Sequence, residues 1–150
     1  MIELNSTIDI LIVEEGAVRH RGKHVPYDDH LGYKTIGYGH LIDPRRGGGI
    51  SEDVARYILK ADIIEKTKEL REHLEWFDDL DSIRQQALLL MVFQMGIQGV
   101  LRFKRMLAAM RNEEWEKAYV EAKDSKWYAQ TPARAQRVAT MIRKGESPYA

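Results

Sequence analysis

Hydrophobic and polar residues recur at helical intervals along most of this chain. Residues 6–15 and 51–74 both show this spacing, so each is predicted to form a helix. Ser6 is expected to cap the first helix and Gly16 to end it, directly after two glutamates. The second helix is long enough to connect two parts of the protein as well as to pack against one of them.

The second half of the chain is predicted to be entirely helical. The stretch 81–96 is apolar on nearly every side from Ala87 onward, which is typical of a central buried helix, and Gly96 is expected to close it. Three further helices are predicted: 103–110, then 113–123 with Asn112 as its cap, and 132–144 between Thr131 as N-cap and Gly145 as terminator.

The segment from 17 to 50 breaks the helical pattern. Within it, "GYKTIGYGHLI" at 32–42 places β-forming residues between three glycines, which favours a small antiparallel sheet or hairpin followed by a loop. We therefore predict one α+β, mostly helical domain over residues 1–150. Its small lobe is residues 16–60, and its helical lobe is built from 1–15 and 75–150, with a cleft between the two as the natural binding place.

Composition narrows the function only a little. The chain is 44% hydrophobic, has a formal net charge of zero and lacks cysteine, so disulfides and thiolate metal ligands are excluded. Zero net charge weakens nucleic-acid binding, although residues 125–145 contain basic residues and no acid. The apolar run 8–13 is too short to span a membrane and lacks the features of a signal peptide.

The candidate catalytic residues in this sequence are acidic side chains. Four histidines lie between positions 20 and 40 without zinc-type spacing, and neither a phosphate-binding loop nor a serine nucleophile motif is present. No metal or cofactor is therefore expected. Glu15 ends a helix, and Asp28 and Asp29 precede the glycine-rich segment. Two carboxyls across a cleft are what glycosidic bond cleavage needs, although a helix end and a turn are the commoner explanation of such acids.

Four segments together resemble the phage lysozymes of the T-even endolysin type, glycoside hydrolase family 24. They are "EEG", "YDDHLGYKTIGYGHLI", "LLLMVFQMGIQGVLRF" and "SKWYAQTPARAQRV", in that order, and the similarity covers nearly the whole chain. The resemblance implies a lysozyme-like fold and a muramidase. Two departures accompany it: a longer segment before Asp29, and "DPRRGGGISED" in place of a longer hairpin after His40.

The resemblance also implies roles for individual residues. Glu15 matches the catalytic acid, Asp29 the later aspartate and Thr35, six positions on, the residue that helps to hold the attacking water. Asp28 is the alternative aspartate, but it would put the threonine one residue too far away. Further matches are saccharide contacts at Leu41 and Phe93, an arginine near the acid at Arg134, and a structural pair formed by His40 and Asp62. Phe93 fits core packing almost as well. Met106 and Glu121 replace two polar cleft contacts and take no role.

The implied reaction is hydrolysis of the β-1,4 bond between N-acetylmuramic acid and N-acetylglucosamine in peptidoglycan, for host-cell lysis. Two alternatives stay open: a lytic transglycosylase acting on the same bond, and an inactive peptidoglycan-binding module. A monomer is expected to wait in the host cytoplasm until a holin opens the membrane and gives it access to the cell wall. A virion-borne enzyme is the other possibility.

Overall fold

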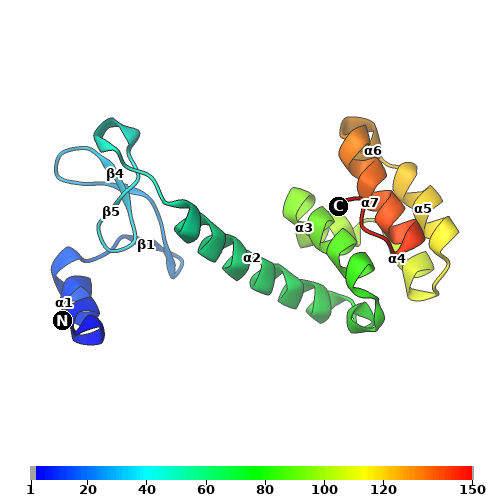
Figure 1. The fold of residues 1–150 in the computed structure, drawn as a ribbon, viewed down its shortest axis with the longest axis horizontal. Coiled ribbons are helices and arrows are strands. Elements are labelled where there is room, and N and C mark those ends of the chain that lie inside the picture. Colours follow the sequence, from blue (N-terminus) through cyan, green and yellow to red (C-terminus); the bar gives the residue numbers. More distant parts are fainter. Residues whose placement is uncertain (1–2, 150) are drawn as a thin grey trace. The chain divides into compact units, whose positions relative to one another are not determined.

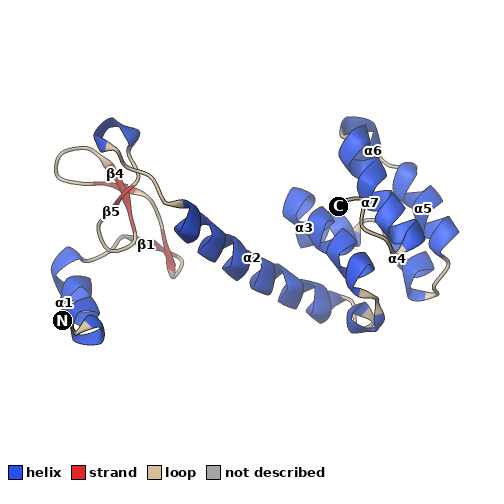
Figure 2. Ribbon diagram, in the orientation of Figure 1, coloured by secondary structure: helices blue, strands red, loops and turns tan. Residues whose placement is uncertain are grey.

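The computed structural model describes residues 3–149, which form two compact units (Figure 1). The first unit extends to Tyr57, and the second begins at Ile58. The combination of helices with a small antiparallel sheet near the start confirms the predicted α+β, mostly helical class (Figure 2). Helix α1 belongs to the first unit, and the expected grouping of residues 1–15 with the helical lobe stays a prediction.

The first unit begins with helix α1, Leu4–Glu15. It ends at Glu15 as predicted, with Gly16 at a positive φ of 62° and its N–H bonded to the carbonyl of Ile12. The predicted cap was wrong. The Glu3 carboxylate accepts the Ser6 N–H at 2.7 Å, so the longer acidic side chain one turn earlier begins the helix.

Two small antiparallel sheets follow α1, where a sheet or hairpin was predicted. The first pairs β1, Arg19–His20, with β2, Lys23–His24. The second has the order β3, Tyr27–Asp28; β4, Lys34–Ile36; and β5, His40–Leu41. Thr35, on the central strand, pairs with Tyr27 on one side and with Leu41 on the other. The longer segment before Asp29 is thus folded as an additional hairpin.

A short 3₁₀ helix, η1, Pro44–Arg46, follows β5 and precedes α2. Asp43 caps it by accepting the Arg45 N–H at 2.9 Å. Gly47 follows in the left-handed conformation. The segment that was expected to be only a loop is therefore an ordered turn of helix.

The second unit is helical. The unit boundary falls within α2, Glu52–His73, which ends one residue before the predicted Leu74. The other helices are η2, Phe77–Asp79; α3, Ser82–Leu101; α4, Lys104–Arg111; α5, Trp115–Lys123; α6, Lys126–Gln130; and α7, Pro132–Lys144. Their buried core draws most heavily on α3, α4 and α7. The burial of α3 was predicted from the apolar run in residues 81–96.

Helix ends in the second unit differ from prediction at three places. Gly96 does not end α3; it has φ 75° and ψ 166° and kinks a helix that continues to Leu101. Asn112 ends α4 instead of capping α5. Thr131 precedes α7 but makes no side-chain cap; its hydroxyl donates back to the Trp127 carbonyl at 3.1 Å. Helix α6, begun by a Ser125 side-chain cap, was not predicted.

Arg84 of α3 secures the end of α7. Its guanidinium donates to the carbonyls of Ile142 at 2.7 Å and Arg143 at 3.0 Å, where the helix leaves carbonyls without internal partners. The same group lies 3.8 Å from the ring centroid of Trp115. Gly145 ends α7 as predicted, with φ 67°.

Within residues 3–149, no single helix is both long and apolar enough to cross a bilayer. Helices α3 and α4 meet these two requirements only as a pair, which is bent by 99°.

Candidate active site

A cavity of about 430 Å³ lies within the first unit. It collects five of the residues singled out from the sequence, from five different elements or loops: Glu15, Asp28, Asp29, Thr35 and Leu41. Its lining is Glu15, Tyr27, Asp28, Asp29, His30, Leu31, Tyr33, Thr35, Gly39, Leu41 and Arg46. Both candidate aspartates, the candidate acid and the candidate threonine thus share one hollow.

Glu15 reaches this cavity from the last position of α1 and packs against Gly39. A Cβ added to Gly39 would lie 2.9 Å from Glu15 Oε2 and 3.3 Å from its carboxyl carbon. Gly39 also has φ 82°, a conformation that side-chain-bearing residues rarely adopt. The glycine between β4 and β5 therefore allows the close approach of the candidate acid to the sheet, a role that the sequence did not reveal.

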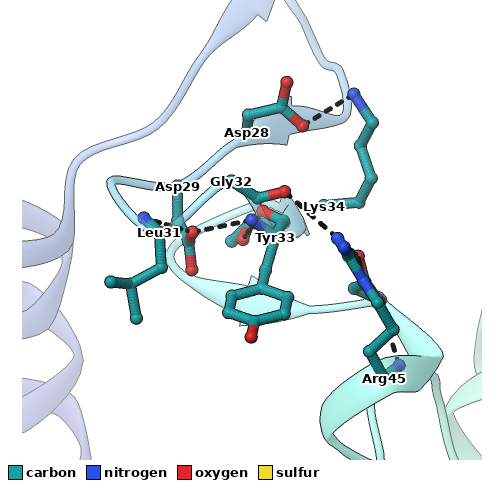
Figure 3. Close-up of polar contacts among 9 residues, drawn as sticks. Asp28, Asp29, Leu31, Gly32, Tyr33, Lys34 and Arg45 are labelled. Atoms are coloured by element: carbon teal, nitrogen blue, oxygen red, sulfur yellow. Dashed lines mark hydrogen bonds and ion pairs between the residues drawn. The ribbon is translucent and has the colours of Figure 1, made fainter.

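Asp29 is held by the loop that joins β3 to β4. Its Oδ1 accepts the backbone N–H groups of Leu31 and Tyr33, both at 2.9 Å (Figure 3). The Tyr33 N–H is the largest cause of a lowered pKa at Asp29, and the Leu31 N–H adds to it, because both stabilise the ionised form. Oδ2 has no hydrogen-bond partner within residues 3–149. Asp29 is therefore an oriented carboxylate with one oxygen available to a ligand.

Asp28 differs from Asp29 although both line the cavity. Its carboxylate forms an ion pair with Lys34 across the β3–β4 register, at 2.7 Å (Figure 3). Thr35, on the central strand, is 4% exposed and donates its hydroxyl to the Tyr33 carbonyl at 3.1 Å. The pairing of Asp28 with a lysine leaves Asp29 as the better candidate for handling water.

One wall of the cavity is built by Tyr33 and η1. The guanidinium carbons of Arg45 and Arg46 lie 4.9 and 4.5 Å from the Tyr33 ring centroid. Arg45 is fixed by Asp43, whose buried carboxylate accepts Arg45 Nε at 2.9 Å, and this bond holds the pKa of Asp43 well below its ordinary value. Sequence reasoning missed this wall, because only the adjacent pair of arginines hinted at it.

The other predicted residues lie elsewhere. His40 Nε2 is 2.6 Å from the Gly49 carbonyl, within the first unit, whereas Asp62 belongs to the second, so their pairing stays a prediction. Phe93 of α3 has Lys66 Nζ 5.3 Å from its ring centroid. Arg134 of α7 donates to the Leu90 carbonyl at 3.3 Å. The roles of these four residues at the site also stay predictions.

The second unit contains a larger cavity, of about 520 Å³. Met106 and Glu121, which replaced two polar contacts in the resemblance, both line it. None of the predicted catalytic residues lines this second cavity. In residues 3–149 no three histidine or acidic side chains are arranged to hold a metal ion.

Comparison with known proteins relates the chain to one family model and to several relatives. A family model described as phage lysozyme matches residues 18–145. The chain is 31% identical to a probable T4-type lysozyme of Dictyostelium discoideum, over 95% of this chain and 96% of that protein. It is 36% identical to the pre-baseplate central spike protein Gp5 of Enterobacteria phage T4, over 79% of this chain. The aligned region is only 25% of the spike protein, so the chain spans about a quarter of that relative.

Proposed function

Because the chain belongs to the phage lysozyme family and is a lysozyme-type glycosidase, we propose that it hydrolyses the β-1,4 bond between N-acetylmuramic acid and N-acetylglucosamine in bacterial peptidoglycan. The observation that carries this proposal is the cavity that brings together Glu15, Asp29 and Thr35. Glycoside hydrolysis needs two carboxyls in different roles, and the surroundings of these two differ.

In the proposed reaction, Glu15 is the general acid. It donates its proton to the glycosidic oxygen as the bond to the leaving sugar breaks. Gly39 contributes by leaving room for the carboxyl against the sheet, so the side chain is supported on one face. Positioning of this kind lowers the barrier because the proton donor needs no rearrangement before it reacts.

Asp29 is the proposed general base. Two backbone N–H groups hold its Oδ1 and favour the ionised form, so Oδ2 can accept a proton from water. Thr35 is proposed to help hold that water. Its hydroxyl donates to a backbone carbonyl, and its oxygen lone pairs can accept a hydrogen bond from the water. Water attack opposite the leaving oxygen gives inversion of the anomeric carbon.

Analysis of digested muropeptides by mass spectrometry tests the reaction. Hydrolysis places a reducing N-acetylmuramic acid at the new end, with one oxygen from solvent, which digestion in ¹⁸O-water would label. Anhydro ends would instead identify a lytic transglycosylase, which needs no water-holding aspartate. Binding without any cleavage would identify an inactive module. We favour hydrolysis over both because Asp29 and Thr35 are present in the cavity with Glu15.

The remaining roles are proposed from the resemblance. Leu41 lines the same cavity and is proposed to contact saccharide, as is Phe93. Arg134 and the pair His40 and Asp62 are proposed to support the site. We also propose that the protein serves host-cell lysis as a monomer, held in the host cytoplasm until a holin opens the route to the cell wall. Purified protein that clears only permeabilised cells would support the need for this second factor.

A further inference from the structure

Arg46 is a cation in the cavity that the proposed mechanism does not use. Its side chain lines the cavity together with Glu15 and Asp29, yet within residues 3–149 it forms no ion pair and donates no hydrogen bond. The neighbouring Arg45 is the opposite case, since Asp43 and the carbonyl of Gly32 take its donors. Arg45 therefore has its donors occupied within the first unit, and Arg46, which lines the cavity, keeps its donors available.

The groups that position Arg46 do not neutralise its charge. Asp43 caps η1 and anchors Arg45, which fixes the backbone from which Arg46 extends. The guanidinium then lies 4.5 Å from the Tyr33 ring centroid. Contact with an aromatic ring restrains a guanidinium while leaving the N–H groups at its edge available, and that edge matches a carboxylate with two parallel hydrogen bonds.

The charges around Arg46 favour an anion supplied by the ligand. The cavity lining holds three acids. Asp28 is already paired with Lys34. Asp29 is oriented by two backbone donors, and the charge of Arg46 lowers its pKa only as a minor cause, without an ion pair between them. Glu15 must carry a proton to act as the proposed acid. No carboxylate within residues 3–149 pairs with Arg46, so its N–H groups are available to the substrate.

We propose that Arg46 is a specificity-determining residue that binds a carboxylate carried by the muramic acid residue of the substrate. The inference rests on the proposed function, because it assumes a peptidoglycan strand in the cavity. Two sources of this carboxylate exist. One is the peptide stem attached to the lactyl group, and the other is the lactyl group itself where the peptide has been removed.

The experiment compares wild type with Arg46→Gln on three soluble glycan strands. The first carries peptide stems, the second has been freed of peptide and exposes lactyl carboxylates, and the third is the first with its carboxylates amidated. We expect KM to rise roughly five- to tenfold for the variant on a carboxylate-bearing strand, the size typical of losing a partly solvated charged hydrogen bond. Amidation is expected to remove the difference between the two proteins. Arg46→Lys keeps the charge without the paired N–H groups, so an intermediate KM is expected.

Arg56→Gln is the matched control. Arg56 is an exposed arginine of α2, paired with Glu52 at 2.9 Å and absent from the cavity lining, so its replacement is expected to leave KM unchanged. A KM effect of Arg46→Gln confined to the first strand identifies the peptide stem, and an effect confined to the second identifies the lactyl carboxylate.

Two results would overturn the inference while leaving the proposed function intact. One is an unchanged KM on both carboxylate-bearing strands. The other is an equal loss of activity on all three strands, amidated included, which would show that Arg46 only supports Tyr33. A wild-type protein that cleaves none of the strands would instead overturn the proposed function and the inference that rests on it.

Discussion

Replacing Gly39 with alanine tests whether the sheet sets the position of the Glu15 carboxyl. The added Cβ would lie 2.9 Å from Glu15 Oε2, where an ordinary van der Waals contact begins at about 3.4 Å. The carboxyl must therefore recede by about 0.5 Å, or the turn between β4 and β5 must shift. Either change displaces the proposed proton donor from its position in the cavity.

The expected magnitude follows from that displacement. A misplacement of about 1 Å can cost a hundredfold in rate, so about 0.5 Å should lower kcat by roughly tenfold. The variant also places a side chain at φ 82°. This strain costs about 1–2 kcal/mol, partly offset by the lower entropy of the unfolded chain with alanine. A modest fall in the thermal midpoint is therefore expected alongside the loss of kcat.

Gly37→Ala separates the two effects. Gly37 also has a positive φ, of 66°, but a Cβ added there would meet nothing within 4 Å, so this variant shares the backbone strain without touching Glu15. Steady-state hydrolysis of soluble peptidoglycan strands is the assay, with circular dichroism for thermal unfolding. Equal kcat values for the two variants would refute the idea that Gly39 positions Glu15.

Three further outcomes are expected. Asp29→Asn should lower hydrolysis by about a hundredfold or more and Asp28→Asn by less than about threefold, and the reverse order in the same assay would identify Asp28 as the base. The hydrogen bond from the Tyr33 N–H lowers the pKa of Asp29, so the ionised Asp29 stabilises the fold. This stability is fully present above the ordinary aspartate pKa of about 4 and is lost as pH falls through the lower pKa of the folded protein. A ¹³C titration that places the folded pKa at or above about 4 would contradict this. Arg84→Met removes two hydrogen bonds at the end of α7 and the contact of the guanidinium with Trp115. The free energy of unfolding is therefore expected to fall by about 2–3 kcal/mol. An unchanged thermal midpoint would show that these contacts contribute nothing.

Helix ends were predicted correctly where the conformational preference of a single residue decides them. Gly16 and Gly145 end their helices as expected, because a positive φ after a helix is favoured for glycine whatever surrounds it. Gly96 obeys the same preference for positive φ, yet the helix resumes after it. Whether a glycine ends or only kinks a helix depends on the packing of the residues that follow, and the spacing of apolar residues does not specify that.

The candidate site was predicted in part for a similar reason. Glu15, Asp29 and Thr35 were found through the motifs around them, and they share one cavity. The contribution of Gly39 depends on contact with a helix end more than twenty positions earlier in the chain, which no local pattern encodes. Arg46 was overlooked because its significance comes from the lack of a partner within residues 3–149, a property of the folded unit.

Glu15→Gln tests the central claim most directly. The amide keeps the shape of the side chain and its contact with Gly39 but cannot supply the proton, so release of reducing ends from purified peptidoglycan should fall at least about a thousandfold. The thermal midpoint should stay within a few degrees of wild type. A variant that still releases reducing ends at a rate near that of wild type would contradict the assignment of Glu15 as the acid, and with it the mechanism built on this cavity.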